Sequence, residues 1–249
     1  MVLAAGAGAR LFPLTRLRPK ALCPVGDRPL VDHALARVRT ATTSVAVNLH
    51  HGLDAMRDHL GAAADVPHLS IERDRARGTA GALGLLRGWI DGRPTVVTNA
   101  DAWLPADLAG LVDGWDGERV RLLCVEDAAR GDFGTLRYCG VALMPWSEVR
   151  DLGPEPAGLY ERSWARSEAE GRLDLVRHDG DFVDCGTPAD YLAANLAWSG
   201  GEPVVGEGAE VGEGADVRRA VVWPGSRVAP GEVLVDAIRA ERLTVLVRN

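Results

Sequence analysis

Lysine is almost absent from this chain: it has 28 Lys and Arg residues in total, and all of them except Lys20 are arginines. The chain has no run of basic residues and its net charge is −7, which argues against a nucleic-acid-binding or membrane-binding surface. No apolar stretch is long enough to span a bilayer, and no signal peptide is recognisable. These absences predict a soluble protein whose partners are neither nucleic acid nor membrane.

Cysteine is scarce as well, and none of its positions forms a C-x-x-C pair: Cys23, Cys124, Cys139 and Cys185 are widely separated. This spacing is typical of a reduced cytoplasmic protein and disfavours a disulfide or zinc framework. A chain of 249 residues can bury a full core, so we expect one main domain with an appendage.

A glycine-rich loop follows the first apolar residues, in the stretch Leu3-Ala4-Ala5-Gly6-Ala7-Gly8-Ala9-Arg10. Glycine has no Cβ, so the backbone can turn tightly here and approach a ligand closely. Successive backbone N–H groups in such a loop form an anion-binding concavity, and Arg10 and Lys20 add positive charge. The Gly-Lys-Ser/Thr of a Walker A loop is absent, and Leu11 replaces the third glycine of a dinucleotide-binding loop. We therefore expect a nucleoside triphosphate site of another type.

Lys20 is the most informative single residue, because an arginine-rich chain keeps its one lysine near this loop, directly after Pro19. Lysine presents a compact point charge, whereas arginine presents a planar fork. A solvated surface lysine is the alternative, since exposure is the default for this residue type.

Apolar periodicity predicts alternating strands and helices. The expected strands cover residues 1–4, 44–48, 68–72, 95–98, 120–125 and 173–178, and the expected helices cover 29–41, 52–60, 79–89 and 158–170. This order is typical of right-handed βαβ units, so the predicted fold class is α/β with a doubly wound, mostly parallel sheet. His50 and His51 follow the second strand, but a zinc site there is disfavoured because no third ligand follows at zinc spacing.

Asp101 is a candidate magnesium ligand, because it lies just past the expected strand over 95–98. A carboxylate at the carboxyl end of an apolar strand is well placed to bind a hard cation. Asp107 and Asp113 are expected on the next helix, as solvated residues.

The sequence pattern changes after residue 199. Apolar residues recur every six positions in two series, Val205, Val211 and Val217, and then Val222, Val228 and Leu234. Such a step is typical of a parallel β-helix, and roughly two coils cannot bury a core alone, since about three or more repeats are needed. We expect residues 200–249 to form a short, hexapeptide β-helix-like segment. It would lean on the main domain, residues 1–199, or on another subunit of a homo-oligomer.

The opening stretch resembles the sugar-1-phosphate nucleotidyltransferase family. The family motif L-A-A-G-x-G-x-R-L-x-P-L-T, followed by P-K-x-L-x-P-V, reads here as Leu3 to Thr15 and Pro19 to Val25. The resemblance implies a Rossmann-like nucleotidyltransferase fold and a loop that binds the nucleotide. The residues implied in that loop are Leu3, Ala4, Ala5, Gly6 and Gly8.

Two later motifs extend the resemblance. Residues 78–83 read G-T-A-G-A-L, which in the family holds the base through its backbone; a tightly packed helix start is the alternative. Residues 182–192 match the family's W/F-x-D-x-G-T-P-x-D-Y-L, which implies that Asp184 is the second metal ligand; a turn residue is the alternative. We expect Thr79 and Thr187 to cap the helices that follow them, the second with Pro188 in its first turn.

The implied site therefore has three groups of residues. The catalytic group is Arg10, Lys20, Asp101 and Asp184, with the two aspartates on Mg²⁺; the base-binding group is Gly78, Thr79 and Gly81; the sugar-binding group is Asn99, Gly134 and Gly140. The chain departs from the family at Ala100, where a glycine is usual, and after residue 130, where a longer hairpin carries a Glu-Lys pair that contacts the sugar phosphate. Arg130 or Arg137 remains as a substitute for the missing lysine.

The implied reaction transfers a nucleoside monophosphate from a nucleoside triphosphate to a sugar 1-phosphate and releases pyrophosphate. Guanylyl transfer to mannose 1-phosphate is the first expectation, from the form of the G-T-A-G-A-L element, and uridylyl transfer to an N-acetylmuramate-type sugar phosphate is the second. A catalytically silent, sugar-nucleotide-binding regulatory homologue is disfavoured because all four charged residues are retained. A dinucleotide-dependent oxidoreductase is disfavoured by the missing third glycine.

Overall fold

A computed structural model describes residues 1–247, and the contacts within it divide the chain into two units. The first unit comprises Met1–Gly6, His33–Ala100 and Leu104–Phe182; the second comprises Ala7–Asp32, Asp101–Trp103 and the chain from Val183 onward. The predicted domains, 1–199 and 200–249, describe a different division and remain a prediction. None of the helices described within residues 1–247 combines the length and the apolar character that crossing a membrane requires.

A seven-stranded sheet forms the centre of the first unit, in the order β10-β8-β9-β6-β1-β4-β5. Its strands are β1 (Val2–Leu3), β4 (Ala46–Leu49), β5 (His68–Ile71), β6 (Thr95–Asn99), β8 (Val120–Glu126), β9 (Leu136–Met144) and β10 (Leu173–Arg177). Strand β9 is antiparallel to both of its neighbours, and every other pair in the sheet is parallel. The expectation of a mostly parallel α/β sheet is confirmed.

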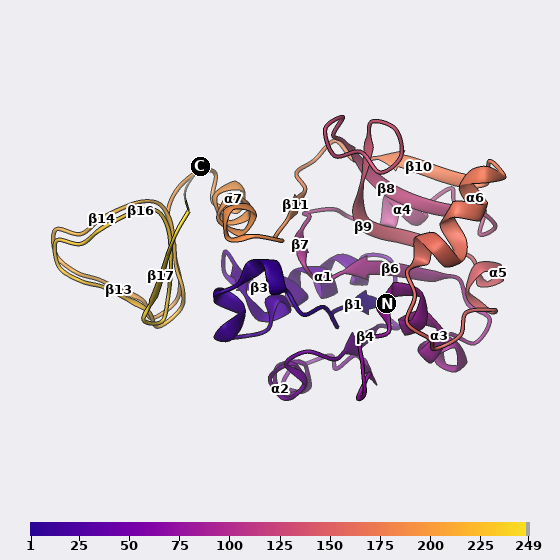
Figure 1. Cartoon of the computed structure of the whole chain (residues 1–249), viewed down its shortest axis with the longest axis horizontal. Coiled ribbons are helices and arrows are strands. Elements are labelled where there is room, and N and C mark those ends of the chain that lie inside the picture. Colours follow the sequence, from indigo (N-terminus) through magenta and orange to yellow (C-terminus); the bar gives the residue numbers. More distant parts are fainter. Residues whose placement is uncertain (248–249) are drawn as a thin grey trace. The chain divides into compact units, whose positions relative to one another are not determined.

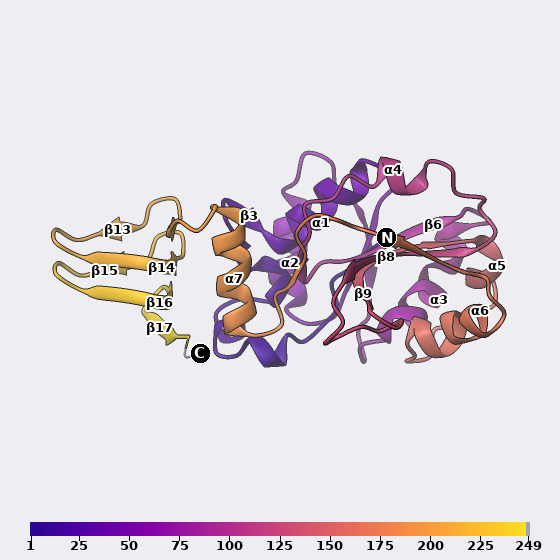
Figure 2. The same ribbon diagram turned by 90° about the horizontal axis from the view of Figure 1, so that it is seen from above.

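Helices cover both faces of this sheet, because side chains alternate along each buried strand. Val141 and Leu143 of β9 pack with α4 (Ala109–Val112), whereas Ala142 and Met144 pack with α3 (Gly78–Ile90). Figure 2 shows α3 and α4 on opposite sides of the strands. The remaining α-helices outside the C-terminal part are α1 (Leu30–Arg39), α2 (Leu53–Gly61), α5 (Trp146–Val149) and α6 (Ala165–Ala169).

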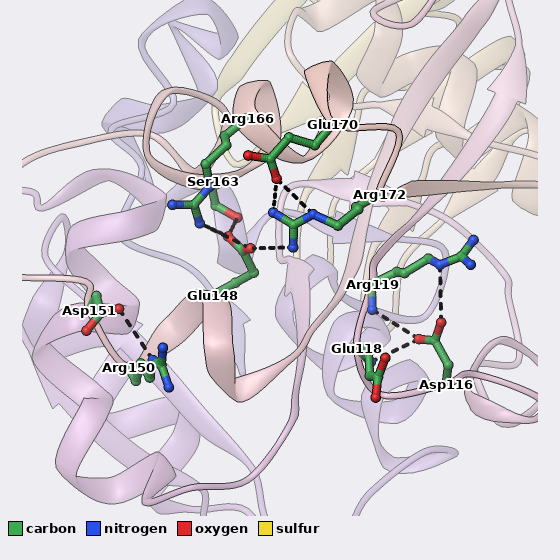
Figure 3. A network of polar contacts seen from close by, with 10 residues as sticks. All are labelled: Asp116, Glu118, Arg119, Glu148, Arg150, Asp151, Ser163, Arg166, Glu170 and Arg172. Carbon is green, nitrogen blue, oxygen red and sulfur yellow. Dashed lines mark hydrogen bonds and ion pairs between the residues drawn. The ribbon is translucent and has the colours of Figure 1, made fainter.

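Two expected helices differ from the sequence prediction. Helix α4 has four residues and excludes both expected aspartates: Asp107 accepts a hydrogen bond from Ala109 N–H before the helix, and Asp113 follows it. The predicted helix over 158–170 is confirmed as a helical segment and differs only in its hydrogen bonding, since it contains a π-helical turn, η4 (Tyr160–Trp164), that continues into α6. Both parts of this segment contact the buried carboxylate of Glu148, which accepts hydrogen bonds from Ser163 Oγ of η4 at 2.7 Å and from Arg166 Nη2 of α6 at 3.1 Å (Figure 3). A buried carboxylate requires such partners.

The second unit contains short turns and strands around one helix. These elements are η1 (Ala9–Leu11), η2 (Leu14–Arg16), η3 (Lys20–Leu22), β2 (Pro24–Val25), β3 (Arg28–Pro29), β7 (Ala102–Trp103), β11 (Val183–Asp184) and α7 (Pro188–Trp198). Helix α7 begins with the expected cap. Thr187 Oγ1 accepts a hydrogen bond from Asp190 N–H, the Asp190 carboxylate accepts one from Thr187 N–H, and Pro188 occupies the first helical turn.

The chain after α7 coils through six short strands of the second unit, β12 (Val204–Val205), β13 (Glu210–Val211), β14 (Asp216–Val222), β15 (Arg227–Val228), β16 (Val233–Ala240) and β17 (Leu243–Leu246). β12, β14 and β16 pair in parallel, and so do β13 and β15. One coil takes 17 residues, as the pairs Val204–Val221 and Val217–Leu234 show. Figure 1 shows the coil end-on and Figure 2 from the side. Its assignment to the hexapeptide β-helix class stays a prediction.

The coil and α7 share one core within the second unit. Trp223, between β14 and β15, is fully buried and donates a hydrogen bond from Nε1 to Tyr191 Oη of α7 at 2.9 Å. Tyr191 in turn donates to the backbone carbonyl of Pro24, and its burial raises the pKa of its phenol well above the usual value. The loop after Lys20, helix α7 and the coil are therefore tied together by buried, directional contacts.

Candidate active site

The glycine loop of the second unit closes over the side chain of Lys20. Gly8 has a φ of 61°, which L side chains rarely adopt, and it precedes the η1 turn. A Cβ at Gly8 would lie 2.7 Å from Lys20 Cβ and 3.1 Å from Thr15 Cγ2. Glycine is therefore required at position 8 for both backbone conformation and close packing.

Lys20 is buried at the N-terminus of η3, with 6% of its surface exposed. Its Nζ lies 3.0 Å from Asp101 Oδ2 and 3.6 Å from Asp184 Oδ1. A buried ammonium is costly unless it is paired, and two carboxylates pair this one. The alternative of a solvated surface lysine is thus inconsistent with the structure.

Backbone contacts hold the two aspartates beside each other. Asp184 in β11 pairs with Ala102 in β7, and Cys185 N–H donates a 3.2 Å hydrogen bond to Asp101 O. Arg10 is largely exposed and places Nη2 3.6 Å from Asp184 Oδ2. A Cβ at Gly186 would lie 3.0 Å from Arg10 Nη2, so a larger residue there would crowd the guanidinium. The four predicted catalytic residues therefore form one cluster, which we call the charged cluster.

The carboxylates of the charged cluster have the donor chemistry of a Mg²⁺ site. Asp101 and Asp184 each place a carboxylate oxygen within 3.6 Å of the same ammonium nitrogen. Within residues 1–247, no group of three or more His, Cys, Asp or Glu side chains is arranged to hold a metal, so the site rests on this pair of carboxylates. Mg²⁺ commonly takes one or two carboxylates and completes its shell with phosphates and water, so these residues fit that ion.

The other half of the glycine loop belongs to the first unit. Leu3 of β1 pairs with Asn48 of β4 and Asn99 of β6, and the chain then leaves the sheet through buried Ala4 and Ala5. A Cβ added at Gly6 would meet nothing within 4 Å, and its φ is not left-handed. No packing contact explains glycine at this position, in contrast to Gly8.

Ala4 begins a chain of buried hydrogen bonds in the first unit. Its N–H donates to Asn48 Oδ1 at 2.9 Å, and Asn48 Nδ2 donates to Glu72 Oε1 at 2.7 Å. The other carboxylate oxygen of Glu72 accepts a 2.6 Å hydrogen bond from Arg77 N–H, immediately before α3. We call these four residues the Asn48–Glu72 relay.

The start of α3 packs tightly against residues 155–159 of the same unit. A Cβ at Gly78 would lie 2.5 Å from Ala157 O, and one at Gly81 would lie 2.3 Å from Glu155 O. The expected cap at Thr79 is wrong: Arg77 is the N-cap residue, and Thr79 Oγ1 accepts a 2.8 Å hydrogen bond from Leu159 N–H. No side chain caps this helix: the free N–H of Ala80 in its first turn donates to Ala157 O at 2.9 Å, so the Thr79 hydroxyl is left to satisfy a donor outside the helix.

Two of the three predicted sugar-binding residues lie together. Gly140 has a φ of 80°, and a Cβ there would lie 3.1 Å from Asn99 Cβ and Nδ2. Gly134 has a φ of 65° in the tight turn before β9, where a Cβ would meet nothing within 4 Å. The positive φ, and no packing contact, accounts for glycine at position 134.

The candidates for the missing second lysine both pair with one carboxylate. Arg130 Nε lies 3.1 Å from Asp127 Oδ2, and Arg137 Nη1 lies 3.6 Å from the same oxygen. His50 Nδ1 lies 2.6 Å from Glu72 O and His51 Nδ1 lies 3.0 Å from Ala5 O, so both imidazoles contact backbone carbonyls.

Known proteins are similar to this chain in sequence and in fold. The family model described as "Nucleotidyl transferase" matches residues 1–135, more than half of the chain. An N-acetylmuramate alpha-1-phosphate uridylyltransferase from Caulobacter vibrioides is 31% identical over 228 residues, covering 78% of this chain and 94% of that protein. This chain belongs to the nucleotidyl transferase family. It is a sugar-1-phosphate nucleotidyltransferase.

One further relative aligns with the whole of this chain, and one solved structure shares its fold. A mannose-1-phosphate guanylyltransferase from Mycobacterium tuberculosis is 27% identical and covers 100% of this chain and 82% of its own length. The structure of a UDP-glucose pyrophosphorylase from Acinetobacter baumanii superposes with a TM-score of 0.64 at 15% identity, over 79% of this chain and 92% of that one. At that identity the likeness shows a shared fold.

Sequence reasoning missed four residues that contact or support predicted site residues within the two units. Asn48 and Glu72 build the relay, and Gly186 gives Arg10 its space. Arg37 of α1 is buried and donates to Thr98 Oγ1 at 2.8 Å and to Asn99 O at 3.0 Å, bracing the strand end that precedes Asp101. A polar residue inside an otherwise apolar strand or helix face was the available signal.

Proposed function

We propose that this nucleotidyltransferase transfers a guanylyl group from GTP to mannose 1-phosphate, releasing pyrophosphate and forming GDP-mannose. The observation that supports guanylyl transfer is coverage, since the mycobacterial mannose-1-phosphate guanylyltransferase aligns with the whole chain, including the C-terminal coil. The G-T-A-G-A-L form of residues 78–83 agrees with that choice.

In this proposal, the charged cluster provides the chemistry. An oxygen of the sugar 1-phosphate attacks the α-phosphorus, a new P–O bond forms, and the bond to the β-phosphate oxygen breaks as pyrophosphate leaves. The nucleophile is already anionic, so no general base is needed, and catalysis consists of positioning and electrostatic stabilisation. Lys20 and Arg10 stabilise the negative charge that accumulates on the departing pyrophosphate.

We assign Mg²⁺ to Asp101 and Asp184. When bound, the ion neutralises charge on the α-phosphate and on the sugar phosphate. Both carboxylates face the ammonium group of Lys20, whose nitrogen lies 3.0 Å from Asp101 Oδ2. Lys20 thereby keeps the carboxylates from repelling each other.

The base and the sugar are assigned to backbone-rich segments. We assign the nucleotide to Leu3, Ala4, Ala5, Gly6 and Gly8, with the base at Gly78, Thr79 and Gly81. We assign the sugar to Asn99, Gly134 and Gly140, of which Asn99 and Gly140 lie in contact range. We assign the phosphate of the sugar 1-phosphate to Arg130 or Arg137, both of which contact Asp127.

Uridylyl transfer to N-acetylmuramate 1-phosphate is the second candidate. It is supported by the 31% identity to the uridylyltransferase from Caulobacter vibrioides, which exceeds the 27% identity to the mycobacterial guanylyltransferase. Because that relative covers only 78% of this chain, whereas the guanylyltransferase covers all of it, we rank it second.

A crossed panel tests both candidates. The purified chain is incubated with Mg²⁺, each of GTP, UTP, dTTP, ATP and CTP, and each of mannose, N-acetylmuramate and glucose 1-phosphate, and pyrophosphate release is measured. We expect the largest kcat/KM with GTP and mannose 1-phosphate. A larger value with UTP and N-acetylmuramate 1-phosphate selects the second candidate, and no release with any pair favours the regulatory homologue.

We further propose that the enzyme is cytoplasmic and that its coil supports a homo-oligomer. Val205 and Val211, at the start of the coil, are 48% and 45% exposed, and such apolar side chains gain from a partner surface. Light scattering on the full chain and on a Val205→Ser/Val211→Ser variant measures this: a mass that falls from oligomer to monomer supports the proposal, and a monomeric parent contradicts it.

A further inference from the structure

Two polar side chains are buried at the ends of neighbouring parallel strands in the first unit. Asn48 lies in β4 and is 3% exposed, and Glu72 follows β5 and is 1% exposed. A buried carboxylate or amide destabilises a fold unless each polar atom is satisfied. Burying these two side chains therefore costs folding free energy, and their hydrogen bonds must offset that cost.

The hydrogen bonds of the Asn48–Glu72 relay end on backbone at both sides. At one end Ala4 N–H donates to Asn48 Oδ1 at 2.9 Å, and at the other Arg77 N–H donates to Glu72 Oε2 at 2.6 Å. Between them, Asn48 Nδ2 donates to Glu72 Oε1 at 2.7 Å. Ala4 N–H lies within the loop assigned to the nucleotide, and Arg77 N–H directly precedes Gly78 and Thr79, which are assigned to its base.

We infer that Asn48 and Glu72 are positioning residues. They fix the first-unit half of the glycine loop and the start of α3 in the one arrangement that binds the nucleoside triphosphate. This inference rests on the proposed nucleotide assignment of those two segments. Neither side chain touches the reacting atoms in this account. They act through the backbone N–H groups of Ala4 and Arg77, and a shift of either segment would weaken nucleotide binding.

The polarity of the relay makes the inference testable by exchange. In Glu72→Gln, the new NH₂ group must face either the NH₂ of Asn48 or Arg77 N–H, so one pair of donors is opposed. In Asn48→Asp, one carboxylate oxygen faces Glu72 Oε1, so two acceptors are opposed. In the double variant Asn48→Asp/Glu72→Gln, the middle hydrogen bond simply reverses: the new amide at position 72 donates to the new carboxylate at position 48, and both terminal N–H groups keep an acceptor.

The experiment measures binding of GTP and of UTP with Mg²⁺ by calorimetry, KM and kcat for the preferred triphosphate, and the melting temperature of each variant. We expect each single variant to raise Kd and KM for the triphosphate about tenfold, which corresponds to about 1.4 kcal/mol, with kcat nearly unchanged. We expect the double variant to return both constants to within about threefold of the parent values, on the same scale.

Ser163→Ala is the matched control. Ser163 is buried in the same unit and donates a 2.7 Å hydrogen bond to Glu148, and neither residue is assigned to the nucleotide. Its loss should lower the melting temperature without changing KM. A merely structural relay would behave like this control.

The outcomes separate the inference from the proposed function. Single variants that are folded and bind the triphosphate as the parent does overturn the inference, and so does a folded double variant whose KM stays ten times above the parent value. Where a single variant does not fold, the double variant alone decides by the same comparison. A parent protein that binds neither GTP nor UTP overturns the nucleotide assignment itself.

Discussion

The charged cluster of the second unit and the Asn48–Glu72 relay of the first unit both bury polar groups, and they satisfy them in different ways. In the cluster, a buried ammonium lies within 3.6 Å of two carboxylates, so opposite charges satisfy each other. In the relay, a neutral amide separates a carboxylate from a backbone N–H. The cluster is therefore suited to presenting charge to a ligand, whereas the relay fixes the positions of two backbone segments. Substitutions that remove charge should therefore affect turnover in the cluster and affinity in the relay.

The largest expected effect comes from neutralising the cluster. Asp101→Asn and Asp184→Asn each keep the shape of the side chain and remove one negative charge. We expect each to reduce kcat about a thousandfold, or about 4 kcal/mol of transition-state stabilisation. Steady-state kinetics at saturating Mg²⁺ provide the measurement, and circular dichroism checks that the fold survives. Asp107→Asn, in an exposed position before α4, is the control. Near-parental turnover in either cluster variant would remove that aspartate from the metal site.

A smaller loss is expected when the cluster keeps its charge but changes its geometry. Lys20→Arg places a wide guanidinium where Gly8 packs against the lysine stem, with a would-be Cβ at only 2.7 Å from Lys20 Cβ. We expect kcat to fall about ten- to a thousandfold, or roughly 1.4–4 kcal/mol. The sugar phosphate KM should change little.

The control for this exchange is Arg16→Lys, which swaps the same two residue types in an exposed η2 position. Amine modification gives a second measurement, because Lys20 is the sole lysine. Labelling of Lys20 should inactivate the enzyme, and Mg²⁺ with GTP should protect it. An active Lys20→Arg enzyme would show that the cluster needs charge alone.

The sequence was sufficient for the cluster and insufficient for the relay. Arg10, Lys20, Asp101 and Asp184 stand in spaced motifs with glycine and proline, so their local pattern is recognisable. Asn48 and Glu72 are single polar residues beside apolar strands, and their partners are 44 and 24 positions apart along the chain. Nothing local marks such a pairing, because the parallel register of β1, β4 and β5 creates it.

The fold shows the same division between local and long-range information. Apolar periodicity predicted α1, α2 and α3 and most strands of the sheet within a few residues. It did not predict that Thr79 bonds to the distant Leu159 N–H and does not cap α3, or that residues 160–164 form a π-helical turn beside Glu148. The cap at Thr187 was predictable because both of its partners lie within four residues.

A moderate effect on stability should distinguish the second unit further. Tyr191→Phe removes the hydroxyl that accepts from Trp223 Nε1 and donates to Pro24 O. Trp223 Nε1 then loses its partner and Pro24 O keeps only a long, 3.5 Å hydrogen bond from Asn195 Nδ2, so we expect the free energy of unfolding to fall by about 2–3 kcal/mol. Urea unfolding measures it. Tyr160→Phe, whose hydroxyl is exposed and contacts Glu168 at 3.3 Å, should change it by less than about 0.5 kcal/mol. Equal effects in the two variants would contradict the buried tie.

The smallest effect is expected from thiol reagents. Burial raises the pKa of Cys23 and Cys185 in the second unit, and of Cys124 and Cys139 in the first, to about 12. At pH 8 the folded protein then has almost no thiolate, which is the reactive form. We expect no rapid reaction with an aromatic disulfide reagent in buffer and four equivalents in urea. Mass mapping along a urea series shows which unit exposes its pair first, and a fast-reacting thiol in buffer would contradict the burial.

The second unit has a consequence for how the protein is made. Its core joins Leu11 and Leu14 to Trp223 and Ile238, so residues near the start of the chain pack against residues made more than 200 positions later. Until the ribosome has added the coil, those early apolar side chains lack their native partners. Folding is cooperative within such a unit, so it is completed only after the coil has been made. Until then, the partly made chain exposes apolar side chains and is prone to aggregate. Nascent chains arrested before Val183 should therefore bind general chaperones that recognise apolar segments, and release from them should coincide with completion of β16.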